Sequence, residues 1–110
     1  MAVGSNKTMP VFDPATGKVV REVTLSTAQE VSDAIQVAHE AFESWSHTTP
    51  LRRARVMFNF KMLLEQHAEE LAGIIVSEHG KVFSDAMGEL TRGMEVVEFA
   101  CGIPHLIKGE

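Results

Sequence analysis

The sequence has a single cysteine, Cys101, and no run near the roughly 20 apolar residues that a membrane-spanning helix needs. One cysteine excludes an intrachain disulfide framework and a zinc site built from several cysteines. It also suits a reducing compartment, so we expect a cytoplasmic protein with no membrane partner. Residues 1–8 lack the apolar core of a signal peptide and the arginine-rich pattern of a mitochondrial presequence, and we interpret them as a flexible lead.

Positive charge is scarce, since 10 Lys and Arg residues stand against 15 Asp and Glu residues, for a net charge of −5. Binding to a polyanion needs a basic surface that releases counterions, so we expect no nucleic-acid partner. The one basic cluster, Arg52, Arg53 and Arg55, begins an amphipathic stretch and is interpreted as a solvated helix face. With 45% apolar and 23% charged residues, the composition is that of a folded globular protein.

Motifs for binding phosphates, dinucleotides or metals are missing as well. Gly80-Lys81 lacks the upstream glycine and the following Ser or Thr of a phosphate loop, and no Gly-x-Gly-x-x-Gly occurs. The five histidines form no His-Glu-x-x-His pattern. A cysteine nucleophile needs an activating base or a positive field, whereas Cys101 falls on the apolar arc of a predicted helix. We interpret it as a packed small hydrophobe, and the residues themselves predict no catalytic, cofactor-binding or metal-ligating set.

A hairpin and about four helices are predicted. β-branched residues on both sides of a turn from Asp13 to Gly17 predict a hairpin over residues 11–23. Thr27 and Glu30 form a capping box that begins a first helix, whose apolar stripe predicts that it lies on a core. We expect further helices at about residues 50–66, 68–79, ending at Gly80, and 84–102, capped by Ser84.

The second and fourth helices each carry two apolar faces, and a hairpin alone is marginal in water. These unfilled faces predict a piece of a larger fold or a tight oligomer. On the second face of the last helix, Arg92 stands among Val96, Phe99 and Ile103. Spacing permits an ion pair with a glutamate on the same helix, whereas the placement also suits a fork that receives a carboxylate.

Four segments of the sequence resemble the aldehyde dehydrogenase superfamily. The turn Asp13–Gly17 (DPATG) is similar to its Asn-Pro-Ala-Thr-Gly turn, with Asp13 in place of asparagine, and Glu78–Lys81 (EHGK) to its Glu-x-Gly-Lys segment. Two longer segments, Leu51–Phe58 (LRRARVMF) and Val96–Leu106 (VVEFACGIPHL), narrow the resemblance to methylmalonate-semialdehyde dehydrogenases. The resemblance extends from about residue 10 to residue 110.

This resemblance implies an α/β fold for the full enzyme, with residues 9–110 as an incomplete N-terminal part of its cofactor-binding domain. It implies NAD-dependent, CoA-acylating oxidation of methylmalonate or malonate semialdehyde to propionyl-CoA or acetyl-CoA with loss of CO2. From the unfilled apolar faces we expect a homo-oligomer. Arg92 matches the family arginine that holds the substrate carboxylate. The family's nucleophilic cysteine and NAD-binding residues lie downstream, so we expect the 110 residues alone to be inactive. The alternative is a non-catalytic helical interaction or regulatory module derived from such an enzyme.

Overall fold

The structure is a computed structural model that describes residues 7–109. Its elements in chain order are two strands, four helices and a final 3₁₀ turn: β1 (Thr8–Phe12), β2 (Val19–Thr24), α1 (Ala28–Trp45), α2 (Pro50–Gln66), α3 (Ala68–His79), α4 (Phe83–Cys101) and η1 (Ile103–His105). The predicted fold of this region, a hairpin followed by about four helices, is confirmed. Within residues 7–109, every helix is too short or too polar to span a bilayer.

The hairpin closes as its turn chemistry predicts. β1 and β2 pair antiparallel, with a register irregularity between Val11 and Phe12. The amide of Ala15 donates to Asp13 Oδ1 at 2.8 Å, and Gly17 has a φ of 69°. β1 begins at Thr8, one residue before the unit 9–110 that the sequence suggests, while residues 1–6 of the expected lead lie outside the described residues.

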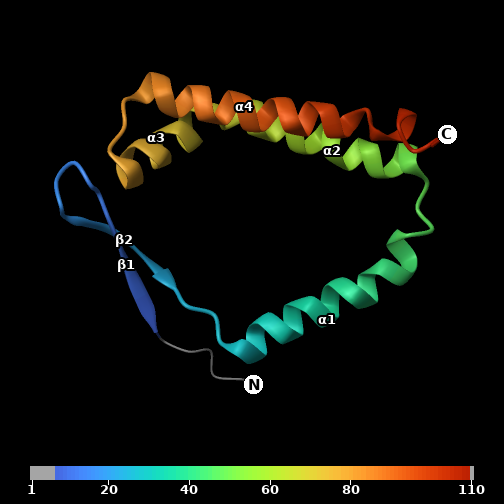
Figure 1. Cartoon of the computed structure of the whole chain (residues 1–110), viewed down its shortest axis with the longest axis horizontal. Helices are drawn as coiled ribbons and strands as arrows, with labels where there is room; N and C mark the ends of the chain where they lie inside the picture. The colour runs from blue at the N-terminus through green and yellow to red at the C-terminus, as the bar shows by residue number, and fades with distance from the viewer. Residues whose placement is uncertain (1–6, 110) are drawn as a thin grey trace.

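Helix α1 begins at the predicted capping box. The amide of Glu30 donates to Thr27 Oγ1 at 3.2 Å, and the amide of Thr27 donates to the Glu30 carboxylate at 2.7 Å. The expectation that α1 lies on a core is wrong for the described chain, because none of its residues is buried, and Ile35 and Phe42 are 66% and 63% exposed. Figure 1 shows the reason: α1 runs apart from the layer that α2, α3 and α4 form.

The next two helices begin and end where the sequence predicts. The amide of Arg52 donates to the Thr49 side chain at 3.4 Å, and α3 ends at Gly80 with a φ of 75°. The predicted cap of α4 is wrong, because Val82 rather than Ser84 precedes the helix. The amide of Ala86 donates to the Val82 carbonyl at 3.2 Å, so the first turn of α4 closes on that backbone group without a side-chain cap.

The only core of the described chain lies where α2 and α3 pack on α4 (Figure 1). Its buried residues are small: Ala54, Ala72, Ala86 and Cys101. The radius of gyration is 18.5 Å, against about 13 Å for a compact chain of this length. The accessible surface is 8819 Å², against about 6000 Å² for a compact monomer of this mass. The prediction of unfilled apolar faces is therefore confirmed.

Candidate functional site

The outer face of α4 carries the residue that the sequence singles out. Arg92 is exposed, and its Nη1 lies 3.7 Å from the position that a Cβ on Gly88 would take, so the guanidinium folds back along its own helix. Val96 and Phe99 follow one and two turns later and are 69% and 67% exposed. Arg92 is therefore a surface cation bordered by two uncovered apolar side chains.

The glutamates that could pair with Arg92 do not do so. Glu89 accepts a short hydrogen bond from the ammonium of Lys81, which lies before the start of α4. This bond lowers the pKa of the Glu89 carboxyl; partial burial opposes the shift, and the charges of Lys81, His79 and Arg92 add to it. Glu95 makes no ion pair with any residue from 7 to 109. The guanidinium of Arg92 is thus left for an anion from outside the described chain.

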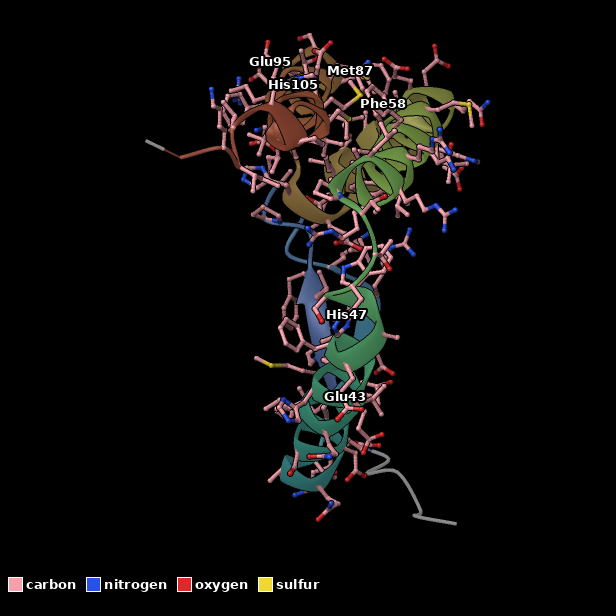
Figure 2. All side chains as sticks on the ribbon, turned by 90° about the vertical axis from the view of Figure 1, so that its right-hand side faces the viewer. Glu43, His47, Phe58, Met87, Glu95 and His105 are labelled. Atoms are coloured by element: carbon pink, nitrogen blue, oxygen red, sulfur yellow. The ribbon has the colours of Figure 1, made fainter. Side chains whose placement is uncertain are left out.

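The inner face of α4 fixes the orientation of Arg92. Met87, Leu90, Met94 and Val97 are half-buried on that side. Figure 2 shows Met87 on the same body of the molecule as Phe58 of α2, and well away from Glu43 of α1 and from His47, which follows that helix. Because the inner face of α4 packs against α2 and α3, Arg92 lies on the opposite, outer face of the helix.

Cys101 is the last residue of α4 and is 7% exposed, as its interpretation as a packed residue predicts. Together with Lys61 and Glu98, it lines a hollow between α2 and the end of α4. The pKa of Lys61 is raised chiefly by its hydrogen bond to Glu65 at 2.5 Å; burial opposes this rise, and weaker electrostatic effects, of which that of Glu65 is the largest, add to it. Among residues 7–109, no group of three or more His, Cys, Asp or Glu side chains is arranged to hold a metal ion.

A second hollow was not predicted. It measures about 410 Å³ and lies between the end of α1, the start of α2 and the turn after α4. Arg53 lines it and is half-buried, whereas Arg52 and Arg55 are exposed as expected. The solvated-face interpretation is therefore wrong for Arg53. Sequence reasoning missed this burial because residues from the end of α1 and the turn after α4 complete the hollow.

The comparisons with known proteins agree on one family. Residues 2–110 match the aldehyde dehydrogenase family. The chain is 48% identical over 106 residues to malonate-semialdehyde dehydrogenase 2 of Oceanobacillus iheyensis and 46% identical over 110 residues to malonate-semialdehyde dehydrogenase 1 of Geobacillus kaustophilus. These alignments cover 96% and 100% of this chain but 22% of each relative.

A solved structure shows the same arrangement of elements. A candidate methylmalonate-semialdehyde dehydrogenase from Sinorhizobium meliloti, in complex with NAD, superposes with a TM-score of 0.90 at 43% identity. The superposition covers 96% of this chain and 22% of the other. The open arrangement in Figure 1 is therefore shared with a segment of a chain more than four times as long.

Proposed function

This chain belongs to the aldehyde dehydrogenase family, and from that membership we propose that it contributes the substrate-carboxylate site of a semialdehyde dehydrogenase. The proposed substrate is malonate or methylmalonate semialdehyde, as in the names of the relatives. The proposed overall reaction is oxidation with NAD and transfer of the acyl group to CoA, with loss of CO2. The products are acetyl-CoA or propionyl-CoA.

Residues 7–109 contain no glycine-rich site for the pyrophosphate of a dinucleotide and no exposed thiol. No helix of residues 7–109 begins with the glycine-rich turn that holds a pyrophosphate, and the only thiol is the buried Cys101. We therefore assign NAD, CoA and the nucleophile to parts of the enzyme outside this chain. The role that we propose for this chain is recognition of the substrate.

The observation that carries this proposal is the free guanidinium of Arg92. A carboxylate can receive two parallel charge-assisted hydrogen bonds from a guanidinium, which a lysine ammonium cannot reproduce. Lys81 holds Glu89, and neither Glu89 nor Glu95 forms an ion pair with Arg92. Val96 and Phe99 on the same face exclude water when covered, which strengthens a charged hydrogen bond. Arg92 is thus suited to position a small aldehyde that carries a carboxylate.

The test uses a chimera in which this chain replaces the matched segment of the Oceanobacillus iheyensis enzyme. We expect Arg92→Lys to lower kcat/KM for malonate semialdehyde by roughly 30- to 1000-fold, the loss of a charged partner in a desolvated site. Propanal, which lacks the carboxylate, should lose less than about threefold. The rate of NADH formation with each substrate gives both values.

Arg55→Lys is the matched control, because Arg55 is an exposed arginine on α2 that lines neither hollow. It should leave kcat/KM for both substrates unchanged. An equal loss of activity toward malonate semialdehyde and propanal in Arg92→Lys would contradict the carboxylate role and would make Arg92 a structural residue. The isolated 110-residue chain provides the blank.

A further inference from the structure

Glu89 is placed to compete with a substrate for the guanidinium of Arg92. It precedes Arg92 by three residues on α4, a spacing at which a carboxylate and a guanidinium on one helix can meet. Arg92 Nη1 lies 3.7 Å from the position that a Cβ on Gly88 would take, so the guanidinium points back toward the turn of α4 that carries Glu89. A glutamate in this place would neutralise Arg92 if no other cation held its carboxylate.

Lys81 is the cation that holds this carboxylate. Its ammonium donates a hydrogen bond to Glu89 Oε1, whereas Arg92 makes no ion pair with any residue in the described range 7–109. The hydrogen bond from Lys81 is the largest cause of the lowered pKa of Glu89, and the charge of Arg92 contributes less. Arg92 is therefore close enough to affect Glu89, but Glu89 pairs with Lys81.

The loop that carries Lys81 is held by the hairpin. The preceding residue, Gly80, has a φ of 75°, and a Cβ there would lie 2.7 Å from Asp13 Oδ1, so the hairpin turn packs directly on this loop (Figure 1). The side chain of Lys81 is only 17% exposed, against 42% for Glu89. Because its surroundings already order the ammonium, the bond to Glu89 costs little additional side-chain entropy. Glu89 therefore pairs with Lys81 in preference to the exposed Arg92.

We propose that Lys81 is a positioning residue of the substrate site: by holding the Glu89 carboxylate, it leaves the guanidinium of Arg92 available to the carboxylate of the semialdehyde. Lys81 acts through Glu89 rather than on the substrate itself. The proposal rests on the proposed role of Arg92, and it adds that recognition of the substrate carboxylate also requires a cation on the loop before α4. Loss of Lys81 should therefore affect substrates that carry a carboxylate and spare those that lack one.

The kinetic test uses the same chimera, with malonate semialdehyde and propanal as substrates. Lys81→Met keeps the covered apolar stem and removes the ammonium, so that Glu89 can turn to Arg92. We expect kcat/KM for malonate semialdehyde to fall by about 5- to 10-fold, between the strength of an exposed ion pair and that of a charged hydrogen bond. The value for propanal should change by less than about twofold.

Removing the competing carboxylate as well gives a result that a structural role of the Lys81–Glu89 bond does not predict. In Lys81→Met/Glu89→Gln, kcat/KM for malonate semialdehyde should return to within about twofold of the unmodified chimera. Lys61→Met is the matched control, because it breaks a lysine–glutamate pair on another helix, that with Glu65, and it should leave both substrates unchanged. Equal losses with both substrates, no recovery in the double variant, or an unchanged Lys81→Met beside a selective loss in Arg92→Lys would overturn the proposal.

A titration without substrate separates this proposal from the proposed function. In the 110-residue chain, Arg92→Met should raise the pKa of Glu89 more in the Lys81→Met background than in the native chain, because only there does Glu89 pair with Arg92. NMR of the Glu89 side chain measures both rises. Equal rises would overturn the proposal whatever the substrate. If the rises differ while Lys81→Met and Arg92→Lys both spare malonate semialdehyde, the exchange of partners stands and the carboxylate role of Arg92 fails.

Discussion

Helices α1 and α4 are nearly equal in length, and they differ in the interactions that stabilise them. α1 has a complete capping box and an apolar stripe, yet none of its 18 residues is buried. α4 has no side-chain cap, yet it carries the buried Ala86 and Cys101 and packs on two other helices. Local sequence chemistry determines where α1 begins, whereas packing supplies most of the stability of a helix in water. We therefore expect α4 to be the more stable of the two in the isolated chain.

The largest expected effect comes from enlarging one alanine on each helix. Ala86 of α4 is fully buried, so Ala86→Leu must displace its neighbours and should lower the free energy of unfolding by about 1–3 kcal/mol. Ala38 of α1 is exposed, so Ala38→Leu should change it by less than about 0.5 kcal/mol. Urea unfolding followed by far-UV circular dichroism measures both. An equal loss from Ala38→Leu would show that α1 is packed in solution.

The next effect concerns the attachment of the hairpin to the helical layer. Gly80 has a φ of 75°, and a Cβ there would lie 2.7 Å from Asp13 Oδ1 in the turn. That oxygen is already fixed by the amide of Ala15. Gly80→Ala should therefore destabilise the chain by about 1–2 kcal/mol and shift the NMR signals of residues 13–17.

Gly73 is the matched control for Gly80, because it lies within α3 and nothing is within 4 Å of its added Cβ. Gly73→Ala should stabilise the chain by about 0.5–1 kcal/mol through helix propensity and leave the turn signals in place. Turn signals that stay unchanged in Gly80→Ala would mean that the hairpin is held elsewhere. The ion pair between Arg21 and Glu78, at 2.9 Å, is the next candidate.

The same division between local and non-local interactions explains which features could be predicted from sequence. The turn at Asp13, the box at Thr27 and the left-handed end at Gly80 each depend on residues within a few positions of one another. The partner of Glu89 could not be predicted, because Lys81 is eight residues away and outside α4. The burial of Arg53 depends on α1 and η1 reaching the same side of α2, which no periodicity within α2 reveals.

The smallest expected effect comes from the bond between Lys81 and Glu89, which joins the loop after α3 to helix α4. The folded pKa of Glu89 is lowered from its ordinary value of 4.5, chiefly by the hydrogen bond from Lys81. The contribution to stability is therefore present above the unfolded pKa and is lost as the pH falls through the folded pKa. The stability difference between the native chain and Glu89→Gln should be small at neutral pH and should vanish in acid.

Two controls separate this bond from a general acid effect. Glu95→Gln removes a glutamate that has no ion pair among residues 7–109, so it should change stability at neutral pH less than Glu89→Gln does. In an NMR titration, Lys81→Met should raise the pKa of Glu89 more than Arg92→Met does, because the hydrogen bond from Lys81 is the larger cause. The reverse order would mean that Glu89 pairs with Arg92 in solution. Arg92 would then be neutralised by its own helix and could not hold a substrate carboxylate.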